Sequence, residues 1–361
     1  MSHSSKIRIL QLIDSLEPGG AERMAVNYAN ALHQKLGFAA LVATRAEGDL
    51  IQQLENGVAY QYLARKKVVD WKSLALLRKL VIQYKITHIQ AHSSSIFFAV
   101  LLKIVYPSIT LIWHDHYGNS ESIQNRPKQA LQWCSLFVKQ IVVVNEILRD
   151  WSKQNLWCRQ VLFLPNFTMA TETTIAETTV LKGLKDKRIV CLANLRPQKN
   201  HKLLLEVANI IRNEHPEWSF HLIGKDFQDD YAKEIKNTIV KLKLENTVFI
   251  YGSKSDINNI LEQSTIGVLT SNSEGLPVAI LEYARKGLPV VATNVGQVAT
   301  VLEEGKAGAL VESDNTDSFV RELMRLIENK DLQIEWATKL KQKVNRDFGV
   351  DKVIDTYIKQ L

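Results

Sequence analysis

Two basic residues and two glutamates in the second half of the chain could together hold an anionic ligand that carries hydroxyl groups. Arg196 and Lys199 stand three residues apart in ANLRPQKNH, a segment between an apolar run and a helical one. Arginine forks onto two phosphate oxygens and lysine supplies a point charge, so the pair suits a diphosphate. Glu274 and Glu282 follow in SNSEGLPVAILEYARKGLPVVA. Because ionised carboxylates accept hydrogen bonds from hydroxyls, one could address a sugar and the other a ribose.

The segment around Glu274 also predicts a cradle of backbone N–H groups. SNSEG leaves the apolar run 266–270, and Pro277 suits the first turn of a helix. Backbone N–H groups between Gly275 and Val278 (Gly275, Leu276 and Val278, since Pro277 has none), with the helix dipole, favour an anion. Taken singly, two glutamates at this spacing or one solvated basic turn are common in helical proteins. The prediction of a ligand site rests on finding both features directly after predicted strands.

The first half holds two weaker signals. Gly19-Gly20 opens a helical stretch after an apolar run, which allows a close approach to a phosphate but equally describes a tight turn. His114 in WHDH and His92 in AHSSS each follow a predicted strand, although a lone histidine is more often structural. His114-Asp115-His116 lacks a further ligand cluster, and no Asp-x-Asp follows a strand, so we expect no metal.

These residues need parallel strands to position them, and short apolar runs alternate with helical stretches as in doubly wound α/β sheets. We expect a domain over 1–167, a polar linker near 167–185, a second domain over 185–344, and a closing segment 345–361 that packs back on the first. The predicted strands are Ile7–Leu12, Phe38–Ala43, Thr87–Ala91, Thr110–Trp113, Ile141–Val144, Arg188–Ala193, Ser219–Ile223, Val248–Tyr251, Ile266–Thr270, Pro289–Ala292 and Ala309–Val311.

Composition narrows the class of protein. The 361 residues are 46% hydrophobic and 23% charged, as in globular domains. No run of about 18 apolar residues predicts a membrane span, and the first residues do not resemble a signal peptide. Three widely spaced cysteines suggest reduced thiols, so we expect a cytoplasmic location. The net charge of +7 is carried by the first half, which suits nucleic acid, anionic lipid or phosphorylated substrates.

Together these motifs resemble the donor site of glycosyltransferase family 4, the large retaining family with the GT-B fold, over most of the chain. The resemblance implies two Rossmann-like domains facing a cleft. It implies that residues matching Arg196 and Lys199 bind the donor diphosphate, that Glu274 contacts sugar hydroxyls and that Glu282 contacts the ribose. Gly275-Leu276-Pro277 would complete the donor pocket.

Further positions follow from the same resemblance. Asn194 would belong to the donor site, and Gly252 lies where the family contacts the base through main chain. Gly19 and Gly20 match an element facing the donor phosphates. His114 matches a cleft histidine that orients sugar or acceptor, and His92 is an acceptor-side candidate. The chain departs from the family at two places. The family often has two glycines where this chain has Gly296-Gln297, and it often has a glycine-rich turn where this chain has Gly224-Lys225-Asp226.

The activity implied is transfer of a hexosyl or N-acetylhexosaminyl group from a UDP- or GDP-sugar to a glycan or lipid-linked acceptor, with retention and without a cofactor, in synthesis of cell-surface polysaccharide or glycoconjugate. Alternatives are a GT-B sugar-nucleotide epimerase and a non-catalytic carbohydrate-binding protein. A dehydrogenase lacks its G-x-G-x-x-G fingerprint, and no nucleic-acid motif is present.

The basic segment 65–85 admits two interpretations. Leu74, Leu77, Leu80 and Val81 form a helical stripe that favours a covering helix over an interfacial one. For the basic charge of this half we expect an anionic membrane surface as a partner, with the protein held peripherally on the inner face of the cell membrane.

Overall fold

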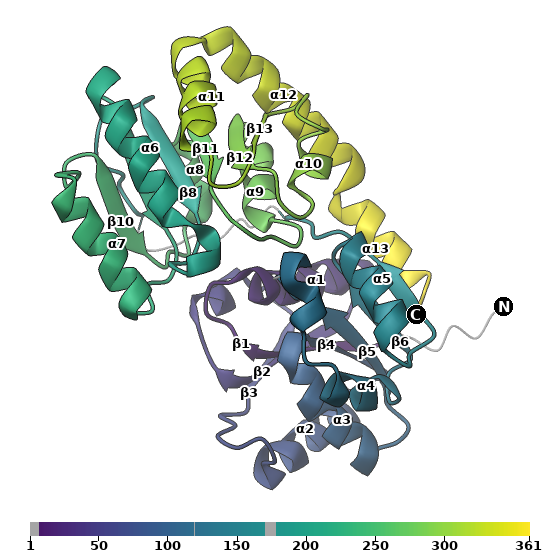
Figure 1. The fold of residues 1–361 in the computed structure, drawn as a ribbon. Coiled ribbons are helices and arrows are strands. Elements are labelled where there is room, and N and C mark those ends of the chain that lie inside the picture. The colour runs from purple at the N-terminus through teal and green to yellow at the C-terminus, as the bar shows by residue number, and fades with distance from the viewer. Residues whose placement is uncertain (1–6, 119, 170–177) are drawn as a thin grey trace. The chain divides into compact units, whose positions relative to one another are not determined.

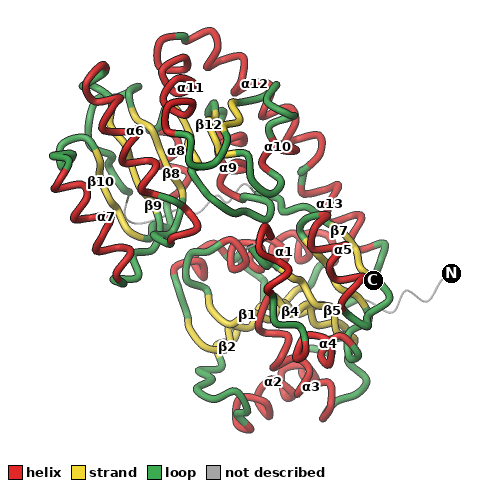
Figure 2. The backbone as a smooth tube through the Cα atoms, in the orientation of Figure 1, coloured by secondary structure: helices red, strands yellow, loops and turns green. Residues whose placement is uncertain are grey.

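The computed structural model describes residues 7–118, 120–169 and 178–361. The described residues divide into two compact units, one of residues up to 169 with Val350–Leu361 and one of residues 178–349. Residues 170–177 of the polar stretch that the sequence suggests as a linker lie outside the described residues. In each unit a sheet is flanked by helices on both faces (Figures 1 and 2).

The N-terminal unit contains a seven-stranded sheet in the order β3-β2-β1-β4-β5-β6-β7. Every pair is parallel; for example, Ile9 pairs with Ala39 on one side and with His88 on the other. The strands are β1 Ile9–Ser15, β2 Ala39–Ala46, β3 Ala59–Tyr62, β4 His88–His92, β5 Thr110–Asp115, β6 Gln140–Val143 and β7 Val161–Phe163. The helices are α1 Gly20–Leu36, α2 Trp71–Gln83, α3 Ile96–Val105, α4 Gln129–Ser135, α5 Glu146–Asn155 and α13 Val350–Ile358.

The C-terminal unit contains a six-stranded parallel sheet in the order β10-β9-β8-β11-β12-β13. Its strands are β8 Arg188–Leu192, β9 Ser219–Ile223, β10 Val248–Gly252, β11 Ile266–Leu269, β12 Val290–Thr293 and β13 Ala309–Val311. Its helices are α6 His201–Glu214, α7 Asp230–Lys241, α8 Ile257–Glu262, α9 Val278–Lys286, α10 Val298–Val301, α11 Thr316–Glu328 and α12 Lys330–Asp347.

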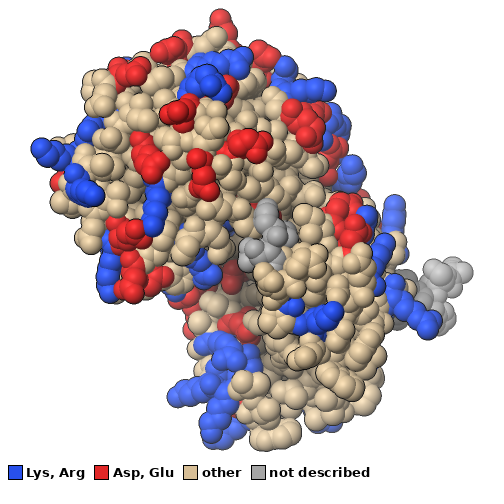
Figure 3. All heavy atoms as spheres, in the orientation of Figure 1, with Lys and Arg blue, Asp and Glu red and all other residues tan. Residues whose placement is uncertain are grey.

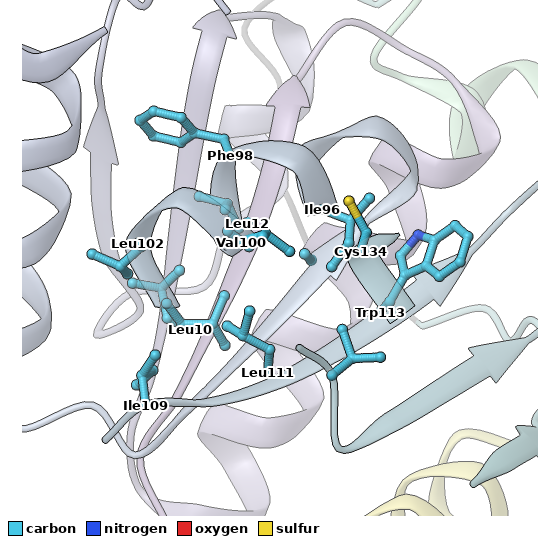
Figure 4. Packing of buried hydrophobic residues seen from close by; sticks show 14 of the residues in the cluster. Leu10, Leu12, Ile96, Phe98, Val100, Leu102, Ile109, Leu111, Trp113 and Cys134 are labelled. Carbon is cyan, nitrogen blue, oxygen red and sulfur yellow. The ribbon is translucent and has the colours of Figure 1, made fainter. Parts of the chain in front are cut away.

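Continuous apolar runs produce these parallel sheets because their central strands are buried on both faces. In the N-terminal unit Leu10 and Leu12 of β1 lie in the same buried cluster as Phe98 of α3 and Trp113 of β5 (Figure 4). This sheet-and-helix core fixes the loops at the strand ends, where the predicted site residues lie.

The last helix belongs to the N-terminal unit. Val353, Ile354 and Tyr357 of α13 are buried, and the Tyr357 ring lies edge-on to Tyr28 of α1 with centroids 5.3 Å apart. Lys35, at the end of α1, pairs with Asp351 at 2.9 Å. The helix therefore caps this unit through apolar packing supported by ion pairs.

The structure contains two strands, β3 and β7, that were not predicted from the sequence. Both β3 and β7 are edge strands of the N-terminal sheet, and their residues are only partly buried. A continuous apolar run marks a central strand that is buried on both faces. An edge strand is less buried and does not need such a run, so this pattern does not detect it. Among the described residues, none of the helices combines the length and the apolar character that a membrane span requires.

Candidate active site

In the C-terminal unit the predicted site residues gather where the order of the sheet reverses. From β8 the chain crosses to β9 on one side, whereas β11 pairs with β8 on the other side. Ligands of open α/β sheets bind outside the carboxyl ends of the strands at such a switch point. The loops that leave β8 and β11 there are 193–200 and 270–277, which contain Lys199 and Glu274.

An ion pair joins these two loops. Lys199 Nζ lies 2.6 Å from Glu274 Oε1, and the two side chains are 21% and 8% exposed. The Ser271 hydroxyl donates to the same carboxylate oxygen at 2.6 Å. Glu274 is therefore held in one orientation by a cation and a hydroxyl, and Lys199 keeps part of its surface open.

Asn200 fixes the turn between Lys199 and α6. It adopts a left-handed conformation (φ 46°), and its side-chain oxygen accepts from Leu203 N at the start of α6. Its amide group donates to Asn272 at 2.9 Å and to Asp314 at 2.8 Å. Asparagine tolerates this backbone conformation and caps helices well, so the residue serves both needs.

Arg196 is exposed and turns toward the loop after β9. Its guanidinium carbon lies 4.4 Å from the centre of the Phe227 ring, and Lys225 Nζ lies 5.2 Å from the same centre. The ring therefore supports two cations beside the switch point through cation–π contacts. Asn194 braces this loop, because its side-chain oxygen accepts from Lys225 N at 2.7 Å.

Close backbone contacts hold the remaining loops in place. A Cβ on Gly296 (φ 55°) would clash with the carbonyl oxygen of Glu274, and Gln297 N donates to Gly275 O at 3.0 Å. Glycine is required at position 296, whereas position 297 makes its contact through the backbone N–H and can be glutamine. Leu276 is buried, and α9 begins at Val278, so Pro277, predicted within the first turn, precedes it.

The departure at Gly224 leaves one essential glycine in place. A Cβ there would clash with the backbone of Ala193, and Gly224 N donates to Gly252 O at 3.0 Å. Gly252 itself has φ 70°. The ends of β8, β9 and β10 thus meet through main chain around the predicted base contact at Gly252.

Glu282 lies in α9, partly exposed and two turns beyond Glu274. The next residue, Tyr283, is fully buried, and its hydroxyl accepts from Leu192 N at 2.7 Å at the end of β8. Its ring occupies the space left by Gly267 in β11. Tyr283 ties α9 to both central strands and was not identified from the sequence; a glycine inside a buried strand was the available signal.

In the N-terminal unit three histidines cluster at the ends of β4 and β5. His92 Nε2 donates to Gln11 Oε1 at 2.7 Å, and His92 Nδ1 lies 2.9 Å from His116 Nε2. With its Nε2 proton on Gln11, His92 presents a lone pair at Nδ1, so His116 Nε2 is the donor. His116 then has an unprotonated Nδ1 that can accept a hydrogen bond. Sequence reasoning identified His92 and His114 but missed this role of Gln11 and His116.

Burial distinguishes the three histidines. His92 and His114 are almost fully buried, whereas His116 is partly exposed. His114 Nδ1 lies 2.9 Å from Gln90 Nε2, and the Tyr28 ring stands edge-on to His114 at 5.2 Å. Burial lowers the pKa of His92 and His114 well below the usual value and lowers the pKa of His116 to about 3. All three are therefore neutral near pH 7.

The same histidines form the one group of three possible metal ligands among the described residues, with ligand atoms within 4.8 Å of one another. The His92 and His116 rings are 13° from parallel, with centroids 5.2 Å apart. That separation equals the 2.9 Å N···N distance plus one ring radius at each end, so the two nitrogens face each other. This is the geometry of a straight hydrogen bond, whereas lone pairs that converge on an ion would meet at an angle.

Gly19 and Gly20 open α1 at the switch point of the N-terminal sheet, where β1 and β4 are adjacent. A Cβ on Gly20 would meet no described atom within 4 Å, so packing within the chain does not require glycine there. A close approach of a ligand to this backbone would require it.

Comparison with known proteins gives matches over most of the chain. Residues 18–168 match the family model for Glycosyltransferase Family 4, and residues 175–343 match the model for glycosyl transferases group 1. A UDP-Gal:alpha-D-GlcNAc-diphosphoundecaprenol alpha-1,3-galactosyltransferase from Escherichia coli is 26% identical over 99% of this chain and 98% of its own length. A glycosyltransferase of Haemophilus influenzae is 25% identical over 94% and 95%.

The fold also has close counterparts among solved structures. The Anabaena HepE protein in complex with UDP-glucose superimposes with a TM-score of 0.80 at 18% identity, covering 98% of this chain and all of that one. Together, the two family models cover most of the chain, and the fold is that of GT-B transferases. The chain belongs to glycosyltransferase family 4.

Proposed function

We propose that this glycosyltransferase moves a hexosyl or N-acetylhexosaminyl group from a UDP-sugar to a lipid-linked glycan acceptor, with retention of anomeric configuration, in the synthesis of a cell-surface polysaccharide or glycoconjugate. The observation that carries the proposal is the Lys199–Glu274 pair at the switch point of the C-terminal sheet, with Arg196 beside it. The E. coli relative, named for UDP-galactose and a diphosphoundecaprenol acceptor, supports the donor and acceptor classes.

The positive groups at the switch point suit the charge change of the reaction. As the anomeric C–O bond breaks, the leaving diphosphate takes the bonding pair and gains negative charge. Arg196, Lys199 and the free amides at the start of α9 would stabilise that charge. These groups supply what a divalent metal supplies in other transferases, so the proposed reaction needs no metal ion or other cofactor.

The two glutamates divide the recognition of the donor. Glu274, held by Lys199 and Ser271, would accept hydrogen bonds from sugar hydroxyls through its second carboxylate oxygen. Glu282, two turns further on, would accept from the ribose. Gly252 and Gly275 would contribute main-chain contacts.

On the acceptor side, His116 is a better candidate for contact with substrate than His114 because it is partly exposed and has an Nδ1 lone pair that can accept a hydrogen bond. His92 and Gln11 then act as positioning residues that fix its tautomer. Gly19 and Gly20 would allow close approach of the donor phosphates. The acceptor proton would pass to the leaving phosphate.

The test is direct. Purified protein should show thermal stabilisation by UDP and by one UDP-sugar in a panel of UDP- and GDP-sugars; a ligand at 100 times its Kd adds about 2.7 kcal/mol. With that donor and a polyprenyl-diphosphate sugar acceptor, proton NMR of the product should give an anomeric coupling that matches the donor's configuration. Inverted product, or only an epimerised nucleotide sugar, would contradict the proposal.

A further inference from the structure

A short segment before α2, Lys66–Lys72, presents apolar and basic side chains to solvent together. Val68, Val69 and Trp71 are 67%, 44% and 69% exposed, and Lys66, Lys67 and Lys72 are exposed as well. Single exposed apolar residues are ordinary, but three in four positions, flanked by three lysines, are not. The apolar stripe of α2 itself (Leu74, Leu77, Leu80 and Val81) is buried, which confirms its structural interpretation.

The base of this segment is held firmly by Arg65. Its guanidinium group is buried (3% exposed) and lies 2.8 Å from Asp14, at the carboxyl end of β1. It also donates to the carbonyl oxygen of Val68 at 3.2 Å and lies 4.6 Å from the centre of the Phe98 ring. Because Arg65 fixes the backbone at Val68, the outward direction of the apolar side chains is a property of the fold.

The other end is fixed by Asp70. Its carboxylate accepts from Ser73 N at 3.1 Å as the N-cap of α2 and from Lys66 N at 3.4 Å. The one acidic residue of the segment is thus engaged with backbone N–H groups. What the segment offers to a partner is three ammonium groups and three apolar side chains.

The surrounding charge has the same sign. Residues 65–160 contain 14 Lys and Arg and 5 Asp and Glu, a net of +9, which exceeds the +7 of the whole chain. In Figure 3 the part of the surface that Figure 1 labels α2, α3 and α4 is mostly uncharged, with a group of basic side chains at its edge. This net positive charge is complementary to an anionic surface.

We infer that the segment Lys66–Lys72 docks the enzyme on an anionic lipid bilayer, with Trp71, Val68 and Val69 in the interfacial layer and the lysines at the phosphate level. Tryptophan favours this depth, and each basic residue near an anionic membrane contributes about 1 kcal/mol. A second copy of the chain is a poorer occupant, because the buried centre of a protein interface is depleted of lysine. Nucleic acid would explain the lysines but would leave the side chains of Val68 and Val69 without an apolar contact.

The position of the segment fits the proposed function, on which the biological meaning of this surface rests. Asp14, which holds Arg65, also accepts from the Ser94 hydroxyl at 2.8 Å, just beyond the end of β4. The docking segment therefore lies at the carboxyl edge of the sheet, the same edge at which His92 ends β4. A lipid-linked acceptor anchored in the bilayer would then be held at this edge.

The test is co-sedimentation of the full-length protein with vesicles of phosphatidylglycerol and phosphatidylcholine, and with phosphatidylcholine alone, at low and high salt. We expect binding only to the anionic vesicles, with release at high salt. Lys66→Gln with Lys67→Gln should weaken binding by roughly 25-fold, about fivefold per lysine. Trp71→Ala and Val68→Ser should each weaken it as well.

Matched controls are available on α7 of the other unit. Lys233→Gln with Lys241→Gln makes the same charge change, and Val240→Ser, at a side chain that is 61% exposed, matches Val68→Ser. These variants should bind as the wild type does. Equal losses in both sets, no binding of the wild type at low salt, or a lipid-free dimer that the loop variants dissociate would overturn the inference.

Failure of this inference and failure of the proposed function are separable. Vesicle binding is measured without donor or acceptor. Transfer is measured in detergent with a short-chain acceptor, where the loop variants should keep wild-type turnover. Anionic vesicle binding without any transfer would discard the proposed reaction and leave the docking surface standing; transfer without vesicle binding would do the reverse.

Discussion

Lys199 and Glu274 connect the loops that leave two adjacent central strands, with Nζ and Oε1 2.6 Å apart and both side chains largely buried. A lysine in this position neutralises the carboxylate in the unliganded protein and has an exposed part that a phosphate could approach. The pair therefore links the stability of the site to its charge. The effect of Lys199 on turnover and its effect on stability can therefore be tested separately.

Replacing Lys199 should impair both turnover and stability. Lys199→Ala removes a cation facing the leaving diphosphate, which should lower kcat about 100-fold. It also leaves Glu274 without its cation at 8% exposure, which should destabilise the C-terminal unit by a few kcal/mol. Steady-state kinetics and urea unfolding measure the two effects.

The double variant separates them. Lys199→Ala with Glu274→Gln leaves no uncompensated charge, so stability should return while kcat stays low. A double variant that regains activity along with stability would show that Lys199 serves only the fold.

Arg196 and Glu282 should produce different kinetic signatures. Arg196→Ala should lower kcat as well as kcat/KM, because the guanidinium acts on charge that develops in the transition state. Glu282→Ala should mainly raise the donor KM, since ribose contacts are the same in the ground state. Phe227→Leu, which removes the ring beneath Arg196, should reproduce part of the Arg196→Ala loss. Wild-type kinetics in both Arg196→Ala and Glu282→Ala would remove the donor-site assignment.

Gly296 should be required for activity through the backbone of Glu274. Gly296→Ala combines a positive φ with a clash against the Glu274 carbonyl oxygen, so it should displace the donor loop and lower donor affinity. Gly287→Ala is the matched control, because φ there is 73° and an added Cβ meets no described atom within 4 Å. Gly287→Ala should lose about 1–2 kcal/mol of stability from the positive φ alone, and Gly296→Ala should lose more because of the clash. Only Gly296→Ala should weaken UDP binding in calorimetry.

Much of the fold was predictable because its central strands are continuous apolar runs. Val290–Thr293, for example, is entirely buried, and the predicted strand Pro289–Ala292 differs from it by one residue at each end. The edge strands Ala59–Tyr62 and Val161–Phe163 were missed because one side of each has no neighbouring strand and their side chains are partly exposed. The alternation of strands and helices was enough to predict two parallel sheets.

The sequence also indicated that the loops of the candidate site lie at one edge of the sheet, since a residue that follows a strand must lie at its carboxyl end. It could not indicate which side chains of these loops contact one another. Arg196 contacts Phe227 from another loop, and Lys199 rather than Arg196 pairs with Glu274. Such contacts depend on the relative height of neighbouring strands and on side-chain rotamers, which the order of residues does not contain.

The histidine cluster predicts a division of roles. His116→Ala should lower kcat at least tenfold and, because its ring is partly exposed, should destabilise the unit less than His114→Ala does, mainly through the hydrogen bond that His92 loses. His114→Ala should mainly destabilise the unit, since it removes a buried ring that contacts Tyr28. His92→Asn should shift the pH profile of kcat by freeing the tautomer of His116, an effect that a purely structural residue would not produce. If His114→Ala lowered kcat more than His116→Ala did, His114 would be the better candidate for contact with substrate.

Stability should decline as the pH falls from 7 to 5. Burial lowers the pKa of His116 and of His221 to about 3 and the pKa of His201 to about 4, whereas an unfolded histidine titrates near 6.5. Below about pH 6.5 the unfolded chain therefore binds protons that the folded chain refuses. The free energy of unfolding should fall by about 1.4 kcal/mol per pH unit for each such group, until the folded pKa is reached.

His221 provides the control for this titration because both its ring nitrogens are engaged, with Ser219 at 2.9 Å and Tyr251 at 3.1 Å, and it is not one of the proposed catalytic groups. His221→Gln cannot take up the proton, so its stability should fall less steeply between pH 7 and pH 5 than that of the wild type. Urea unfolding at pH 7, 6 and 5 gives the two slopes. Parallel slopes would mean that His221 takes up its proton in the folded state, and that its burial does not exclude charge as argued here.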